Sequence, residues 1–193
     1  MMIEIREETA DCIDDYASVP MTYMVSSRLR VSLSESGLAG VTLTEEPVVP
    51  PWEKDYDRDY GDADNPRGWK RWSTIDGWGF WSAFDGPDRI GGAALAWRTP
   101  ELCMLKGRDD IAALWDMRVT PDYRRQGTGR ALFEAATRGA RQRGCRLLLI
   151  ETQNVNVPAC RFYAAQGCTL GAIDRFAYAD LPDETQLIWT LPL

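Results

Sequence analysis

Residues 115–130, WDMRVTPDYRRQGTGR, constrain the chain most strongly, because they join a strand pattern to a helix pattern through a short basic loop. The strand pattern ends at Val119, and the helix pattern continues past Arg130 as ALFEAA. Gly127 and Gly129 have no Cβ, so the backbone between them can turn sharply and approach a ligand closely. The first N–H groups of a helix lack acceptors within the helix and favour anions. The sequence therefore predicts a phosphate-binding turn.

Two other phosphate-binding loops do not match this turn. The dinucleotide fingerprint needs a third glycine, and Leu132 occupies that position. A nucleoside-triphosphate loop needs Gly-Lys-Ser or Gly-Lys-Thr, which the stretch does not contain. The remaining alternative is that Arg124 and Arg125 are simply a solvated, basic start of a helix.

The length and the cysteine pattern predict one globular domain, 1–193, in the cytoplasm. The sequence of 193 residues has no apolar run near the ~20 residues that cross a bilayer, so we expect no membrane association. The five cysteines are odd in number and show no CxxC pair, which is typical of reduced thiols. Histidine is missing, which excludes Ser-His-Asp catalysis and His-ligated metals and leaves carboxylates, tyrosine and cysteine for proton transfer. We expect no metal.

The net charge of −7 is unevenly distributed along the chain. Residues 123–146 contain seven arginines and one glutamate, whereas residues 52–64 contain six acidic residues, one lysine and one arginine. The first region suits an anionic cofactor and the second a cationic substrate, although an ordinary charged surface is the alternative for each. So acidic a chain is unsuited to nucleic acid.

Sequence patterns predict the following order of elements. Strands are expected at 2–6, 22–34, 40–45, 77–85, 89–98, 111–119, 146–152, 170–179 and 186–191, with helices at 9–20, 128–143 and 156–166. Gly91-Gly92 predicts a bulge or a close backbone approach. Pro47, Pro50 and Pro51 are expected to break regular structure. The acidic, aromatic segment 52–72 is expected to form a partly helical lid or substrate loop outside the core.

A second motif follows the predicted strand 146–152. It reads Asn156-x-x-Ala159-x-x-Phe162-Tyr163-x-x-x-Gly167. Together with Arg124-x-x-Gly127-x-Gly129, it resembles the GCN5-related N-acetyltransferase (GNAT) superfamily. One departure is Cys168, where that family often has phenylalanine. The runs ETQN at 151–154 and ACRFY at 159–163 are similar to the streptothricin, or nourseothricin, acetyltransferase branch; the similarity is good over 110–193 and thin elsewhere.

This resemblance implies both a fold and a cofactor. The fold would be α/β (α+β), with a mixed, mostly antiparallel sheet of six to seven strands, a central splayed parallel pair and flanking helices. The cofactor would be acetyl-CoA, with Asn156 on its pantetheine or diphosphate arm and the Tyr163 hydroxyl near its sulfur. The expected cofactor-binding residues are Met117, Val119, Arg124, Arg125, Gln126, Gly127, Thr128, Gly129, Arg130, Asn156 and Tyr163.

Amine acetylation needs a base and an acid. An alkylammonium has a pKa of ~10.4, so a carboxylate, directly or through a water, must take its proton at neutral pH. The candidates are Glu151 and Asp116; the alternative is that both have structural roles. Tyr163 suits protonation of the departing thiolate, unless it is only a core aromatic. The N–H groups of Val119 and Met117, at the splay, would face the acetyl carbonyl.

Trp52, Tyr56 and Tyr60 recur every four residues, so in a helix they would line one side, with Asp55 and Asp59 on a neighbouring side. Such a surface predicts an acceptor site, formed by Trp52, Asp55, Tyr56 and Asp59, that binds a cation by charge and by cation–π contact.

Three functions are consistent with these features. The first is direct acetyl transfer from acetyl-CoA to a primary amine of a small cationic molecule, with a streptothricin-type antibiotic as one candidate. The second is the same reaction on a protein N-terminus or lysine. The third is an acyl-CoA-binding regulatory module without turnover, against which Tyr163, Glu151 and the complete loop argue. A homodimer is also compatible, since Gln186–Leu191 could pair across a two-fold axis, as in this superfamily.

Overall fold

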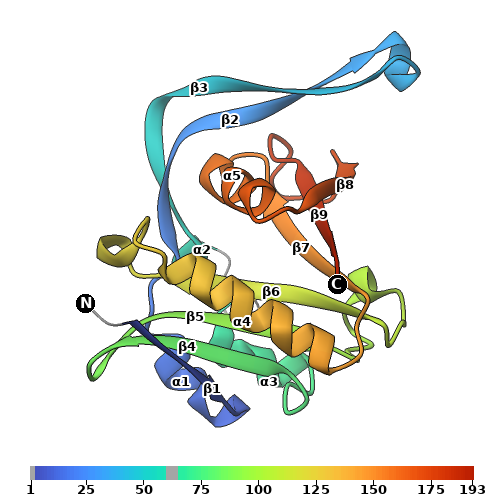
Figure 1. The fold of residues 1–193 in the computed structure, drawn as a ribbon. Helices are drawn as coiled ribbons and strands as arrows, with labels where there is room; N and C mark the ends of the chain where they lie inside the picture. The colour runs from blue at the N-terminus through green and yellow to red at the C-terminus, as the bar shows by residue number, and fades with distance from the viewer. Residues whose placement is uncertain (1–2, 60–64) are drawn as a thin grey trace. The chain divides into compact units, whose positions relative to one another are not determined.

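The computed structural model describes residues 3–59 and 65–193 and contains one large sheet and one two-stranded ribbon (Figure 1). The sheet has the strand order β1-β4-β5-β6-β7-β9-β8. Its strands are β1 (Ile3–Glu8), β4 (Gly79–Asp85), β5 (Asp88–Trp97), β6 (Ile111–Val119), β7 (Leu147–Gln153), β8 (Thr169–Asp174) and β9 (Gln186–Pro192). The ribbon consists of β2 (Thr22–Ser34) and β3 (Gly40–Asp55).

The helices are short apart from the two that follow the predicted motifs. They are α1 (Ile13–Tyr16), α2 (Tyr56–Asp59), α3 (Trp69–Trp72), α4 (Thr128–Gln142) and α5 (Val157–Ala165). Single 3₁₀ turns precede α1, α3 and α4. Among the described residues, no helix combines the length and the apolar character that crossing a membrane requires.

The chain divides into two compact units, each built from separate segments of the sequence. The first unit contains Met1–Thr22, Asp55–Ile150 and Leu191–Leu193, and the second contains Tyr23–Lys54 and Glu151–Thr190. The basic loop therefore belongs to the first unit, whereas the second motif and the ribbon belong to the second. The expectation that residues 1–193 form one domain stays a prediction.

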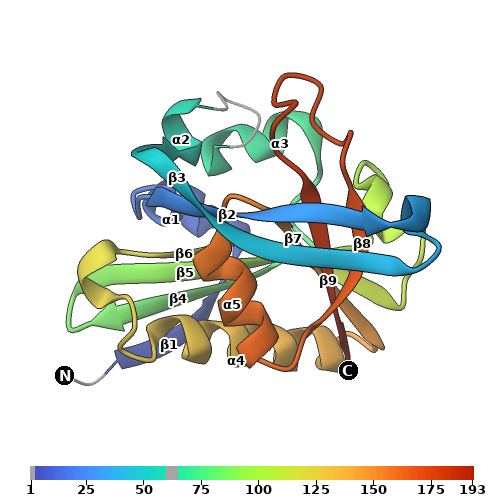
Figure 2. The same cartoon turned by 90° about the horizontal axis from the view of Figure 1, so that it is seen from above.

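The predicted hairpin of β4 and β5 is confirmed, and its two glycines explain how helices pack on both faces of the sheet. A Cβ on Gly91 would lie 3.1 Å from Leu132 of α4, and a Cβ on Gly92 would lie 2.4 Å from the ring of Tyr16 in α1. Because consecutive strand residues point to opposite faces, α4 and α1 cover opposite sides of β5 (Figures 1 and 2). The predicted close backbone approach at these glycines is confirmed, and the neighbouring register shift lies opposite Ala83 and Phe84.

Small residues let α4 lie low on the sheet, as the sequence predicted. Ala135, Ala136 and Ala140 are buried, and a Cβ on Gly139 would collide with the ring of Trp81. The helix ends at Gln142, and Gly144 follows it with a φ of +78°, the left-handed conformation expected of a glycine after a helix. The packing of α4 against β4, β5 and β6 fixes the start of this helix beside the end of β6.

The sheet is mostly antiparallel, with one parallel pair at its centre, as expected. The ladder between β6 and β7 runs from Ile111–Leu147 to Leu114–Ile150, although the strands themselves continue to Val119 and Gln153. Pairing therefore ends well before the carboxyl end of β6, as a splayed pair requires.

The position of β9 corrects one expectation. This strand has β7 on one side and β8 on the other, so both of its hydrogen-bonding edges are occupied. Gln186–Leu191 therefore has no free edge for a second copy among the described strands, and the homodimer itself stays a prediction. The edge strands of the large sheet are β1 and β8.

The prediction that prolines end the second ribbon strand was wrong. β3 continues through Pro47, Pro50 and Pro51 to Asp55 instead of stopping at Glu45. Each strand of a two-stranded ribbon has one open edge, and a proline is tolerated there because no partner needs its missing N–H.

The expectation that residues 52–72 lie outside the core was also wrong. Lys54 and Trp69 are each 1% exposed. The Trp69 ring packs 5.5 Å from Trp78 and 6.1 Å from Tyr16. The segment begins as the end of β3 and then forms α2 and α3, so only part of it is exposed. Tyr60 lies outside the described residues.

Candidate functional site

A bulge in β6 sets the direction of the backbone at the end of this strand. Ala94 pairs with Asp116 and Leu95 with Leu114, so Trp115 is the extra residue. Past the bulge, the N–H of Thr120 donates to the carbonyl oxygen of Ile90 at 2.9 Å and so points toward β5.

Because N–H groups alternate between the two edges of a strand, those of Val119 and Met117 point to the other edge. That edge is where the ladder with β7 ends. Two adjacent N–H donors at an open strand edge can stabilise negative charge on a carbonyl oxygen.

The loop after β6 delivers the chain into α4 through a glycine in a left-handed conformation. Gly127 precedes α4 with a φ of +93°, and a Cβ at this position would meet no atom within 4 Å. The first helical hydrogen bond runs from Ala131 N–H to Gly127 O at 3.0 Å. The N–H groups of Thr128, Gly129 and Arg130 therefore lie in the first turn, where a helix offers no acceptors of its own. This turn has the form of an anion site.

The polar side chains of the loop have different roles. Arg124 donates from Nε to Val119 O at 2.8 Å and from Nη2 to Thr22 O at 2.7 Å, so it braces the end of β6. Its burial lowers the pKa of its guanidinium. Arg125 is exposed, with a φ of +59°. Gln126 and Thr128 bond to loop carbonyls, and the exposed Arg130 pairs with Glu134 at 2.8 Å. The exposed arginines are thus better placed than Arg124 to meet an anion.

Asp116 lies in a buried polar network in the first unit. Its Oδ1 accepts from the Tyr16 hydroxyl at 2.6 Å and from Arg118 Nε at 2.9 Å, and its Oδ2 accepts from Arg118 Nη2 at 2.7 Å. The Asp116 and Arg118 side chains are 5% and 1% exposed. Burial, then the charge of Asp116, raises the pKa of Tyr16 well above its ordinary value, so this phenol stays a donor.

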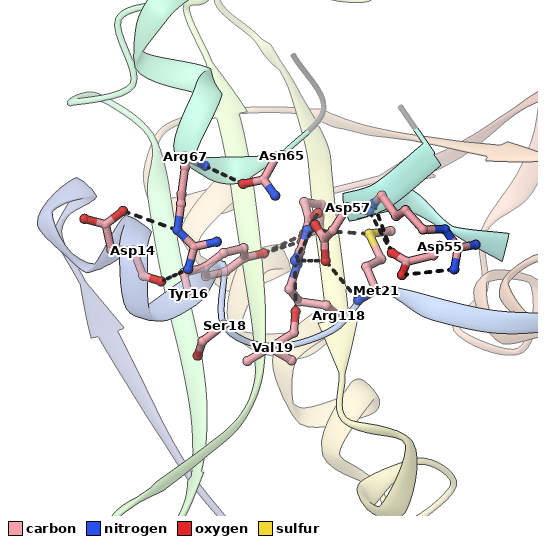
Figure 3. Close-up of polar contacts among 12 residues, drawn as sticks. Asp14, Tyr16, Ser18, Val19, Met21, Asp55, Asp57, Asn65, Arg67 and Arg118 are labelled. Atoms are coloured by element: carbon pink, nitrogen blue, oxygen red, sulfur yellow. Dashed lines mark hydrogen bonds and ion pairs between the residues drawn. The ribbon is translucent and has the colours of Figure 1, made fainter. Parts of the chain in front are cut away.

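The same network also anchors α2. Arg118 Nη1 donates to Val19 O at 2.9 Å and to both carboxylate oxygens of Asp57 at 3.2 Å (Figure 3). Asp57 Oδ2 accepts in turn from the backbone N–H of Met21 at 3.3 Å. Sequence analysis missed Arg118 and Asp57, which are 61 positions apart. One sequence signal could have found Arg118: it stands two positions after Asp116 on a predicted strand, so the two opposite charges lie on the same face.

The acidic segment does not form the helical face that its spacing predicted. Trp52 lies in β3 in the second unit, whereas Tyr56 begins α2 in the first unit. Asp55 Oδ1 accepts from the N–H groups of residues 57 and 58 at 3.0 and 3.2 Å, and Asp55 N–H donates to Asp59 Oδ2 at 3.0 Å. Asp55 and Asp59 thus close the turn around α2. The predicted helical face was wrong because β3 extends through Trp52 to Asp55, so these two residues lie in a strand and not in a helix.

Glu151 is the first second-unit residue of β7, and two neutral groups hold its carboxylate. The Tyr178 hydroxyl donates to Oε1 at 2.7 Å, and Gln186 Nε2 donates to Oε2 at 2.8 Å. Gln153 lies on the same face of β7, and its Nε2 donates to the Tyr178 hydroxyl at 3.3 Å. Glu151 is half-buried. Sequence analysis missed Tyr178 and Gln186 as its partners.

The second motif forms α5 as predicted. Asn156 caps the helix, since its Oδ1 accepts from Ala159 N–H at 3.1 Å, and this leaves the amide Nδ2 group outside that bond. Tyr163 is 7% exposed, and its ring lies edge-on to Phe162 at 5.2 Å. Gly167 ends the segment with a φ of +88°. Burial raises the pKa of the Cys160 thiol, which makes this cysteine a poor nucleophile.

A family model described as "Acetyltransferase (GNAT) family" matches residues 46–168. Among curated proteins, streptothricin acetyltransferase A of Bacillus subtilis (strain 168) is 33% identical over 108 residues, which cover 51% of this chain and 61% of that protein. The alignment therefore spans less than two thirds of the relative's own length.

Two solved structures are similar over the whole chain. A nourseothricin acetyltransferase has a TM-score of 0.75 and 26% identity, covering 100% of this chain and 99% of that one. A Bacillus anthracis strain Ames protein, described as a streptothricin acetyltransferase in complex with acetyl coenzyme A, also has a TM-score of 0.75 and 26% identity, with coverages of 100% and 98%.

Proposed function

The chain belongs to the acetyltransferase (GNAT) family, and we propose that it is an acetyl-CoA-dependent N-acetyltransferase acting on a primary amine of a small cationic molecule. The observation that carries this proposal is the first turn of α4, an anion site next to the open edge of β6. The similarity of the whole chain to a protein solved in complex with acetyl coenzyme A supports acetyl-CoA as the cofactor. The likeness to streptothricin and nourseothricin acetyltransferases supports an antibiotic of that type as the acceptor.

The residues of the first unit fit a diphosphate. The N–H groups of Thr128, Gly129 and Arg130 are available in the first turn of α4, and Gly127 leaves the approach to them open. Arg125 and Arg130 supply exposed positive charge. Gln126 and Arg124 hold the loop in shape. The role of Asn156 on the pantetheine arm is proposed from the second motif alone, because this residue belongs to the other unit.

Acetyl-CoA, when bound, would supply the thioester from which the acetyl group is transferred directly to the amine. The N–H groups of Met117 and Val119 would stabilise charge on the acetyl oxygen. Glu151 would accept the proton of the attacking amine, directly or through a water, and Tyr163 would donate a proton to the departing sulfur. Because Asp116 is neutralised by Arg118, we assign it to the support of β6 rather than to proton transfer.

Acceptor binding is proposed for the acidic segment. Trp52 is 40% exposed, and Tyr56, Asp55 and Asp59 lie around α2. Their charge favours a polycationic amine over a neutral one.

Release of free thiol from acetyl-CoA tests the activity. The acceptors should be nourseothricin, simple polyamines and a peptide with a free N-terminus. We expect nourseothricin to stimulate release most strongly. Stimulation by the peptide alone would favour the protein-directed alternative, and the absence of release with every amine would contradict the enzyme. Tyr163→Phe should lower turnover by about 10²-fold with cofactor affinity nearly intact.

The cofactor loop has a matched control in the ribbon. Gly127→Val places a branched side chain at a φ of +93° beside the first turn of α4, whereas Gly37→Val does the same at a φ of +99° in the ribbon. The two changes impose similar backbone strain, and neither Cβ meets an atom within 4 Å. Calorimetry should show weakened acetyl-CoA binding only for Gly127→Val. Equal affinities in the two folded variants would contradict the assignment of the loop.

A further inference from the structure

The carboxylate of Glu151 is held at both oxygens by donors that carry no charge. The Tyr178 hydroxyl lies 2.7 Å from Oε1 and the Gln186 amide 2.8 Å from Oε2. Because one donor binds each carboxylate oxygen, these two bonds fix the orientation of the carboxylate. Hydrogen bonds to the charged form of a carboxylate favour that form.

Tyr178 is itself fixed, although it lies between two strands and not in one. Gln153 Nε2 donates to its hydroxyl at 3.3 Å, which leaves the hydroxyl proton directed at Glu151. Two backbone hydrogen bonds hold the chain after Tyr178. Leu181 N–H donates to Tyr178 O at 3.2 Å, and Glu184 N–H donates to Leu181 O at 2.9 Å.

A buried ion pair holds the far end of this segment. Lys54 Nζ lies 2.6 and 2.5 Å from the two carboxylate oxygens of Glu184, and the side chains are 1% and 7% exposed. The negative charge of Glu184 also raises the pKa of Tyr178, and Lys54 forms the ion pair that neutralises this charge. The segment from Tyr178 to Glu184 is therefore anchored at both ends within the second unit.

The protonation state of Tyr178 suits a permanent donor. Burial, followed by the charge of Glu151 and its hydrogen bond, raises the pKa of the Tyr178 hydroxyl above its ordinary value. The phenol therefore keeps its proton throughout the neutral range and gives a hydrogen bond to Glu151 without taking the proton that Glu151 is to receive.

We propose that Tyr178 and Gln186 are positioning residues that hold Glu151 ionised and aimed for proton transfer. This inference rests on the proposed function, because it needs Glu151 to be the base. A base acts only when it is deprotonated, so activity falls as the pH drops through its pKa. Removing the Tyr178 hydroxyl should raise that pKa and move the loss of activity to higher pH.

The test is the pH profile of kcat/KM for Tyr178→Phe, measured by thiol release from acetyl-CoA with nourseothricin. We expect the acidic limb to move up by about one pH unit, as the loss of a hydrogen bond to a charged group implies. At the lower pH values kcat should fall about tenfold, while the KM for acetyl-CoA stays unchanged. Gln186→Met, which removes the other donor, should move the limb in the same direction.

Tyr123→Phe is the matched control. The Tyr123 hydroxyl also donates to a carboxylate, Asp85 Oδ2 at 3.3 Å, but this pair belongs to the first unit and, among the described residues, forms no hydrogen bond with Tyr178 or Gln186. Its loss should leave the acidic limb in place. An acidic limb that stays in place in both folded Tyr178→Phe and Gln186→Met would overturn the inference. If Tyr178→Phe does not fold, Gln186→Met alone decides it.

Glu151→Gln separates this inference from the proposed function. A large loss of kcat in Glu151→Gln, with an unmoved limb in Tyr178→Phe, overturns only the positioning role. Full activity of Glu151→Gln overturns the base assignment and the inference with it. An absence of thiol release in the wild type overturns the proposed function itself.

Discussion

Asp116 of β6 and Glu151 of β7 each accept a hydrogen bond from a tyrosine hydroxyl, yet their surroundings differ in charge and in burial. Arg118 contacts both oxygens of Asp116, and the pair is almost fully buried. Tyr178 and Gln186, which are neutral, contact Glu151, and its side chain is half-buried.

The difference shows that position on a central strand does not by itself make a carboxylate a base. A carboxylate bound at both oxygens by a buried arginine is part of an ion-pair network, and its charge is needed to keep that arginine in place. A carboxylate held by neutral donors keeps its orientation and can still accept a proton. The comparison supports our proposal that Asp116 has a supporting role and that Glu151 is the base.

The largest effect should come from breaking the charged network. Arg118→Met keeps the side-chain length but leaves Asp116 buried without its cation. Loss of one partner of a buried pair should lower the free energy of unfolding by about 3–5 kcal/mol, measured by urea denaturation. Arg130→Met is the control, because the Arg130–Glu134 pair is 72% and 49% exposed and should matter by less than about 0.5 kcal/mol. Similar losses in both variants would contradict the network's role.

Exchanging each carboxylate for its amide compares the two directly. Glu151→Gln should lower kcat/KM by about 10²-fold or more, with little change in stability. Asp116→Asn should do the reverse, lowering stability by up to about 3 kcal/mol while the turnover of folded enzyme stays within about tenfold. Thiol release and urea denaturation on the same preparations measure both quantities. The opposite pattern would make Asp116 the base.

Alkaline pH should weaken both clusters through their tyrosines. Burial first, and the neighbouring carboxylate second, raises the pKa of Tyr16 and of Tyr178 in the folded protein. The stability that this gives is fully present below the unfolded tyrosine pKa of ~10 and is lost as the pH rises from there toward the folded values. Between pH 9 and 11.5 the free energy of unfolding should fall less steeply with pH in Tyr16→Phe and in Tyr178→Phe than in the wild type. The difference in slope should correspond to about one proton for each variant. Declines parallel to the wild type would refute this.

The smallest effect is expected in the acidic segment. Asp55→Asn with Asp59→Asn removes two partly exposed charges around α2, and should raise the KM of a cationic acceptor several-fold at low salt. Added salt should mimic this loss, and the KM of acetyl-CoA should not change. A double variant with an unchanged acceptor KM at low salt would mean that the segment is an ordinary solvated surface.

Sequence alone determined the features that depend on neighbours in the chain. The sharp turn at Gly127, the start of α4 and the extent of α5 were predictable, because helix ends and turns are fixed by residues a few positions apart. The strand order around β6 and β7 also followed, through the resemblance that the two motifs carry. The two candidate bases were both identified, but they could not be told apart.

Tertiary structure decided everything that depends on distant residues. Arg118 meets Asp57 across 61 positions, and Tyr178 meets Glu151 across 27, and no local pattern records either contact. The course of β3 through three prolines and the placement of β9 inside the sheet depend on which edges other strands occupy. A carboxylate's charge environment is set by packing, so only the folded chain shows that a buried arginine binds Asp116, whereas a phenol and an amide bind Glu151.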